Sequence, residues 1–213
     1  MPKSARFRTL TKELNRLKKQ FLPKISPTGL YSDRQLMRTL AYRVLAHAEI
    51  ESYLEDRVRE VVLDAKKAWD NKGETRRTLI CLLGFSSLNM DEPPDTLTPK
   101  KGSKTVKEEK IKINKKIDLS LEHFNRVINQ NHGVKEENIL ALLLPIGIDS
   151  DDLDPAWLAI MNTFGENRGE VAHKSSTSYI TIRPPDPATE INTVKQITQE
   201  ILIIDELINN LMK

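Results

Sequence analysis

Residues 32–69 read SDRQLMRTLAYRVLAHAEIESYLEDRVREVVLDAKKAW, and they carry the strongest structural signal in the chain. Ser32 with Gln35 three residues later is a capping-box pattern, which is typical of a helix N-terminus. Apolar side chains then recur at helical spacing, at positions 36, 40, 44, 48, 54, 58, 62 and 65. The pattern predicts one long helix that ends near Trp69, with Gly73 as its stop, and this helix is expected to form the centre of a bundle.

Shorter helical patterns flank this stretch on both sides. An amphipathic helix is predicted over residues 4–20, where Leu10, Leu14 and Leu17 share one face and Pro23 follows. Asp154 before Pro155 is a typical start for a further helix. Other helices are predicted at about residues 75–85, 119–128, 136–144 and 187–211, with an extended segment over residues 177–183. The fold class expected is all-α, a helical bundle.

Charge and composition divide the chain of 213 residues. Residues 1–24 carry eight Lys or Arg and one acid, so the remaining residues sum to −4 for a net charge of +3. We expect 1–24 to be a basic helical extension and 25–213 to be one helical domain. Residues 91–116, rich in lysine and proline, are expected to form a disordered insertion in it. Both basic segments could neutralise RNA phosphates, or could be a solvated helix face and a loop.

Several classes of protein lack support in this sequence. The longest apolar run, 139–148, is interrupted by Pro145 and Gly147 and is far shorter than the roughly 20 residues of a membrane span. The single cysteine, Cys81, indicates a cytoplasmic location. Phosphate-binding and dinucleotide-binding glycine loops, a G-x-S-x-G elbow and zinc-binding motifs are missing, so we expect no cofactor and no metal site.

Residues 166–176, ENRGEVAHKSS, hold the most informative pair of side chains. Arg168 is a permanent cation, and His173 is a proton carrier that titrates near neutral pH. Five positions on a regular helix are about 140° apart, so the two side chains converge only if Gly169 breaks the helix or a second subunit contributes. Alternatively, Arg168 pairs with Glu166 or Glu170 on the surface and His173 caps a helix C-terminus.

Two segments of the chain resemble the HEPN superfamily, particularly its RiboL-PSP-associated branch. One is RTLAYRVLAHAEIESYLEDRV, which contains Glu51, and the other is ENRGEVAHKSS, whose Arg168 and His173 fit the R-x4-6-H pattern of that superfamily. The similarity covers about residues 30–210. One departure is that Gly169 follows the arginine, where the family usually has a polar residue, while Asn167 precedes it.

The resemblance implies a metal-independent endoribonuclease that acts as a homodimer, with two R-x4-H motifs in one cleft. His173 of each subunit would supply acid and base, and Arg168 would hold the phosphate. Asn167 is the candidate polar assistant, and Glu51, together with His47, would line the cleft and set the charge of the imidazole. RNA is then the partner, and a toxin–antitoxin or anti-phage role would add an antitoxin or regulatory protein.

Two other interpretations remain open at this point. In the first, a HEPN-like dimer has lost catalysis and binds RNA, a nucleotide or a protein through its basic segments, for which Gly169 is the best support. In the second, the chain is a purely structural helical scaffold, and Arg168 and His173 are incidental.

Overall fold

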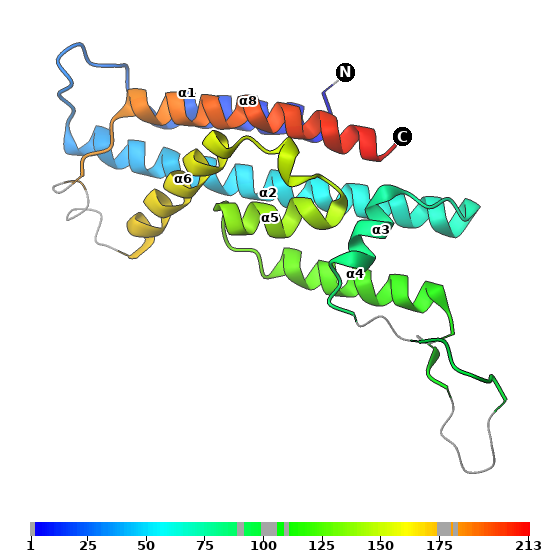
Figure 1. The fold of residues 1–213 in the computed structure, drawn as a ribbon. Helices are drawn as coiled ribbons and strands as arrows, with labels where there is room; N and C mark the ends of the chain where they lie inside the picture. Colours follow the sequence, from blue (N-terminus) through cyan, green and yellow to red (C-terminus); the bar gives the residue numbers. More distant parts are fainter. Residues whose placement is uncertain (1–2, 89–91, 99–105, 109–110, 174–179, 181–182) are drawn as a thin grey trace.

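The computed structural model shows a bundle of helices built around one long central helix (Figure 1). It describes residues 3–88, 92–98, 106–108, 111–173, 180 and 183–213, without the side chains of 171–173. The helices are α1 (Ala5–Phe21), α2 (Asp33–Lys72), α3 (Arg77–Gly84), α4 (Ile113–Asn129), α5 (Glu136–Leu143), α6 (Pro155–His173) and α8 (Pro187–Leu211). Two short 3-10 turns, Leu144–Ile146 and Ser150–Asp152, connect α5 to α6. The predicted all-α class is confirmed.

Helix α2 is the central element, as its sequence predicts. Its 40 residues extend over about 60 Å at 1.5 Å per residue. The Ser32 hydroxyl accepts a hydrogen bond from the Gln35 amide, and the Gln35 side chain accepts one from the Ser32 amide at 2.8 Å, which completes the capping box. Gly73 ends the helix at φ +66°, a left-handed conformation that glycine adopts without strain.

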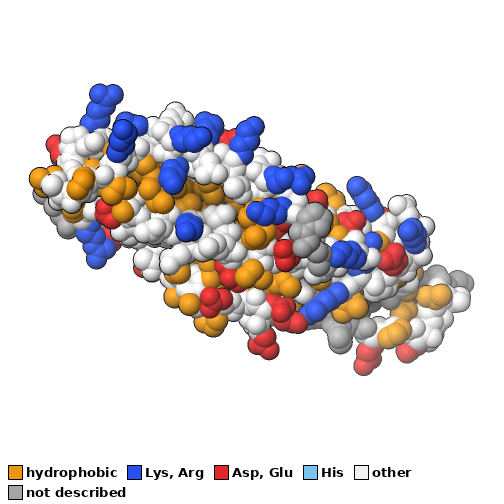
Figure 2. All heavy atoms as spheres, turned by 90° about the horizontal axis from the view of Figure 1, so that it is seen from above, with side chains coloured by type: hydrophobic (Ala, Val, Ile, Leu, Met, Phe, Trp, Pro, Cys, Tyr) orange, Lys and Arg blue, Asp and Glu red, His pale blue; other side chains and the backbone are white. Residues whose placement is uncertain are grey.

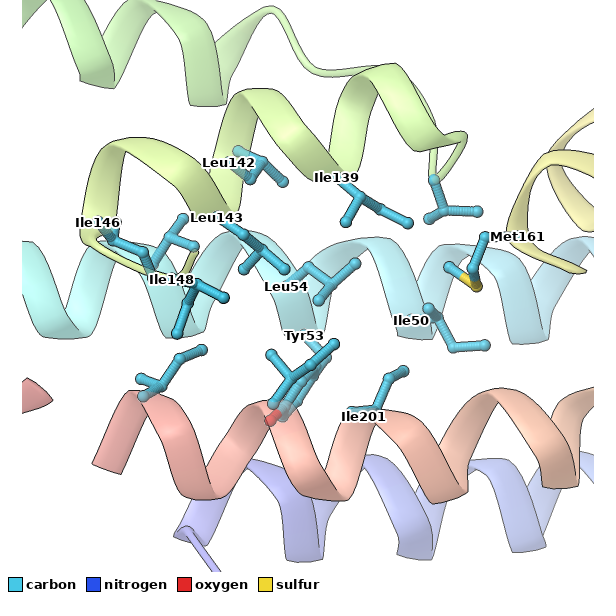
Figure 3. Packing of buried hydrophobic residues seen from close by; sticks show 14 of the residues in the cluster. Ile50, Tyr53, Leu54, Ile139, Leu142, Leu143, Ile146, Ile148, Met161 and Ile201 are labelled. Carbon is cyan, nitrogen blue, oxygen red and sulfur yellow. The ribbon is translucent and has the colours of Figure 1, made fainter. Parts of the chain in front are cut away.

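The other helices cover α2 on two sides. Helices α1 and α8 lie together along one side, and α5 lies between α2 and α4 on the other (Figure 1). Helix α6 contacts both α2 and α8. Figure 3 shows the packing where these layers meet, with Ile50 of α2, Ile139 of α5 and Met161 of α6 in the same cluster. All three side chains are fully buried, so one continuous core fixes the position of α6 against α2.

A buried polar network ties the N-terminus of α1 to α2 and α8. The Asp205 carboxylate accepts hydrogen bonds from the Ser4 amide at 2.8 Å, the Ser4 hydroxyl at 2.6 Å and the Tyr53 hydroxyl at 2.8 Å. Arg57 Nε lies 3.0 Å from Asp205 Oδ1, but its N–H is not directed at an acceptor, so this contact is an ion pair. Arg57 and Asp205 are both completely buried, so each depends on the other for its charge to be tolerated.

Helix α1 packs into this core although its outer face is basic. Its four buried residues, Phe7, Leu10, Leu14 and Leu17, belong to the same cluster as the core residues of α2 and α8. The separation of residues 1–24 from a domain at 25–213 stays a prediction. No helix in the described ranges has an apolar stretch that could span a bilayer, and the cytoplasmic location stays a prediction.

The start of α4 differs from the sequence-based prediction, and parts of two other predicted segments lie outside the described residues. Helix α4 begins at Ile113, six residues earlier than predicted, because Ile117 is buried and extends the apolar stripe toward the N-terminus. The end of the predicted insertion, including Lys115 and Lys116, is therefore helical. Insertion residues 91, 99–105 and 109–110, and most of the predicted extended segment at 177–183, lie outside the described residues.

Candidate functional site

Helix α6 carries the motif arginine toward the surface from a well-defined start. The Ala156 amide donates to the Asp154 side chain at 2.9 Å, and Pro155 takes the first helical position, as the sequence predicts. Helix α6 then continues through Gly169 to His173. The helix break that would bring the two motif residues together within one chain is therefore not found. The side chain of His173 lies outside the described residues.

Arg168 is a candidate anion-binding side chain. Among the residues that the structure describes, its guanidinium has no ion-pair or hydrogen-bond partner. The surface ion pair considered from the sequence is not formed, and Arg183 Nη1 lies 3.5 Å from Glu170 Oε2 instead. A permanently charged side chain without an internal counter-ion is a candidate ligand for a phosphate or carboxylate group.

Arg168 and Gly169 line a pocket of about 270 Å³ with residues from two other elements. Helix α2 contributes His47, and the loop between α4 and α5, with the first turn of α5, contributes the opposite wall. That wall consists of Gln130, His132, Gly133, Val134, Lys135, Glu137 and Asn138. Three segments that are distant in sequence therefore meet at the motif arginine.

His47 is a buried polar side chain in the wall of this pocket. It is only 2% exposed, and its ring stacks on Phe164 with centroids 5.6 Å apart and an interplanar angle of 29°. Its Nδ1 lies 3.5 Å from Glu51 Oε2, across one helical turn, as the spacing of the two residues predicts. Glu51 does not line the pocket itself, so its candidate role is to orient or charge His47.

Asn167 is not brought into the pocket. It is half-buried on α6 beside Arg168, but it is missing from the pocket wall among the described residues. Its assignment as polar assistant stays a prediction. Gly169, at the position where the resemblance leads us to expect a polar side chain, borders the pocket and has no atom within 4 Å of where a Cβ would lie.

Lys135 is a pocket residue that sequence reasoning missed. It has no ion-pair partner within the described part of the chain, and its stem crosses α6 at Gly165. A Cβ built on Gly165 would lie 2.9 Å from Lys135 Cγ, so the close approach requires glycine there. The available signal was the loop sequence QNHGVK, residues 130–135, in which a histidine and a lysine flank a glycine between two helices.

The arrangement is suited to anions that carry hydrogen-bonding groups. Arg168 and Lys135 supply positive charge, while His47 and the exposed His132 supply imidazole rings. In the ranges that the structure covers, no group of three or more His, Cys, Asp or Glu side chains is placed to hold a metal ion. Phosphate binding with proton transfer is the chemistry that these side chains support.

Comparison with known proteins identifies a family for nearly the whole chain. The family model described as RiboL-PSP-HEPN matches residues 5–210, which include α1, the pocket and the motif arginine. The match starts well before residue 30, where the resemblance read from the sequence began. No curated protein and no solved structure matches the chain.

Proposed function

The chain belongs to the RiboL-PSP-HEPN family of the HEPN superfamily, and from this premise we propose that it is a metal-independent endoribonuclease that acts as a homodimer. The family match supports a nuclease or RNA-related module at the coarse level. The toxin–antitoxin or anti-phage setting, with an antitoxin or regulatory protein as partner, is part of the proposal and depends on the family alone.

One observation carries this proposal. Arg168, which has no partner among the residues that the structure describes, lines a pocket together with Lys135 and a histidine buried on α2. Two cations at the mouth of a pocket of this size fit the phosphate of one nucleotide and its neighbour better than they fit an uncharged ligand.

The chemistry follows from the residue types. A neutral imidazole accepts the proton of a ribose 2′-hydroxyl as its oxygen attacks the adjacent phosphorus. A protonated imidazole then donates to the departing 5′-oxygen, which leaves a 2′,3′-cyclic phosphate on one fragment and a 5′-hydroxyl on the other. Such general acid–base catalysis contributes about 10²- to 10⁴-fold. Arg168 stabilises the charge that builds on the non-bridging phosphate oxygens in the transition state.

The continuous helix α6 favours a composite site between two subunits. Positions 168 and 173 are five residues apart, which is about 140° around an unbroken helix. Arg168 of one copy therefore meets His173 of the other more readily than its own. Two copies also supply the two imidazoles that the acid and base steps need. His47, whose Nδ1 lies 3.5 Å from Glu51 Oε2, lines each half-site, and Glu51 orients its ring.

The test is cleavage of labelled RNA in the presence of EDTA. Arg168→Ala and His173→Ala are expected to abolish cleavage, whereas the matched controls Arg34→Ala and His123→Ala, which lie outside the pocket, keep it. The wild-type products should carry cyclic phosphate ends, and an RNA with 2′-deoxy substitution at the cut should be inert. Cleavage that survives in both motif variants, shown to be folded and dimeric, would refute the proposed site.

A second candidate function is binding of RNA, a nucleotide or a protein without catalysis. It is favoured by Gly169, which leaves the pocket without the polar side chain expected after the arginine. A Cβ at position 169 would have no atom within 4 Å, so Gly169→Asn tests this alternative directly. If wild type binds RNA without cutting it and Gly169→Asn cuts it, the wild-type protein is a binding module.

A further inference from the structure

A second pocket lies on the opposite side of α2 and shares no residue with the Arg168 pocket. It is a groove of about 400 Å³ between α1 and α8. Its apolar surface comes from Phe7, Leu14, Tyr42, Ile191, Val194 and Leu202. Figure 2, which views the molecule from above α1 and α8, shows hydrophobic side chains gathered along this surface with Lys and Arg side chains on either side. Its volume falls within the roughly 300–1,000 Å³ of small-molecule sites.

Tyr42 of α2 lines the groove, and its hydroxyl has no hydrogen-bond partner among the described residues. The residue is 2% exposed. The nearest acid that acts on it, Glu190, is already engaged by the Arg43 guanidinium in a buried ion pair. Burial, followed by the Glu190 charge, raises the pKa of Tyr42 to about 12, so the hydroxyl stays protonated and available as a donor. An acceptor atom of a ligand in the groove can therefore pair with this hydroxyl in place of solvent.

The remaining polar groups indicate the charge of the ligand. The hydroxyls of Thr11 and Thr198 donate to carbonyls of their own helices and need no ligand. Lys3, Lys18 and Lys195 lie on the rim without ion-pair partners in the described ranges. Lys3 Nζ lies 5.4 Å above the Phe7 ring. None of the described residues that line the groove is acidic, so it combines an apolar interior with a cationic edge.

We propose that the α1–α8 groove is a binding site for a small amphipathic anion, a molecule with an apolar body and a carboxylate or similar group. The apolar body lies against Phe7, Leu14 and Leu202, and the charged group meets the rim lysines. A hydrogen-bond acceptor on the ligand pairs with the Tyr42 hydroxyl. Helices α1 and α8 form the walls, so occupancy of the groove stabilises their mutual packing.

The probes are octanoate and its neutral match 1-octanol, measured by displacement of the fluorescent anion 8-anilinonaphthalene-1-sulfonate from the full-length protein. Octanoate should displace the dye with a stoichiometry of one, and 1-octanol should do so more weakly. The double change Lys18→Gln with Lys195→Gln should weaken octanoate by about five- to twentyfold, since each exposed charge pair contributes up to about 1 kcal/mol. The matched control, Lys12→Gln with Lys19→Gln on the exposed face of α1, should bind as wild type does.

Tryptophan substitutions that fill the groove distinguish binding inside it from adsorption of the dye to the protein surface. Thr198→Trp on one wall, or Thr11→Trp on the other, should eliminate displaceable dye binding in protein whose helix content and melting are unchanged. Tyr42→Phe should weaken the binding of octanoate a few-fold and the binding of 1-octanol by less. The proposal is overturned if wild type shows no saturable binding, if both tryptophan variants bind as wild type does, or if the two lysine pairs behave alike. Loss of self-association in the tryptophan variants, without any ligand binding by wild type, would assign the groove to a second copy of the chain.

Discussion

Replacing Asp205 by alanine should destabilise the protein severely, because this side chain holds three elements together. Its carboxylate accepts from the Ser4 amide and hydroxyl at the start of α1 and from the Tyr53 hydroxyl on α2. It also faces Arg57, whose side chain is 0% exposed. Asp205→Ala leaves the Arg57 charge in the core, the Tyr53 hydroxyl without its acceptor and the N-cap residue of α1 without its anchor.

The expected loss is about 3 kcal/mol. Removing one partner of a buried ion pair typically costs about 3–5 kcal/mol, because the other charge is left uncompensated. The lower end applies here, since Arg57 keeps its contact with Glu60 and donates to Asn209 Oδ1 at 2.8 Å. A domain of this size is stable by only about 5–15 kcal/mol, so the loss is a large fraction of the total. Restoring neutrality with Arg57→Met and Asp205→Leu together should recover much of it.

Urea denaturation followed by circular dichroism measures this change. The exposed ion pair between Lys66 and Asp70 on α2 provides the control, since Asp70→Ala should cost no more than about 0.5 kcal/mol. Hydrogen exchange should show faster opening of α1 in Asp205→Ala, because Ser4 loses its attachment to α8. A loss below about 1 kcal/mol, or protection of α1 equal to that of wild type, would contradict the role assigned to the network.

Four further changes test the local geometry. Gly169→Ala should raise the unfolding free energy by about 0.5–1 kcal/mol, because the new methyl group meets open space in a helix interior. Gly165→Ala should lower the unfolding free energy, because the new Cβ would lie 2.9 Å from Lys135 Cγ, and it should also weaken RNA binding. Equal melting temperatures for Gly165→Ala and Gly169→Ala would refute this reasoning. Asp186→Ala, which removes the side chain that accepts from the Thr189 amide, should cost about 1 kcal/mol in urea denaturation. Folding raises the pKa of the Tyr42 hydroxyl from 10 to about 12, because the buried side chain favours the neutral form. The stability that neutral Tyr42 contributes is therefore complete below pH 10 and is lost as the pH rises toward 12. Relative to Tyr42→Phe, wild type should lose about 1.4 kcal/mol per pH unit in that window, and parallel pH profiles would contradict the assignment.

Local sequence patterns were sufficient for the helices and for most of their ends, although α4 begins six residues earlier than predicted. The capping box at Ser32, the left-handed stop at Gly73 and the aspartate–proline start at Asp154 all appear where their chemistry predicts them. Such signals depend on contacts within a few residues, which sequence spacing describes completely. The contact of His47 with Glu51 is equally local, because residues four apart share a helix face.

Tertiary structure alone decided what surrounds the motif arginine. The pairing of Arg168 with Glu166 or Glu170 was as consistent with the sequence as an open anion site was, and only the packed structure shows the guanidinium without a partner in the described residues. Lys135 reaches the same pocket because Gly165 admits its stem, a contact between residues 30 positions apart that no local pattern encodes. The sequence by itself therefore determined the helices, the family resemblance and the candidate arginine. The composition of the pocket was set by how α2, α6 and the α4–α5 loop pack, because contacts between distant segments depend on the whole core.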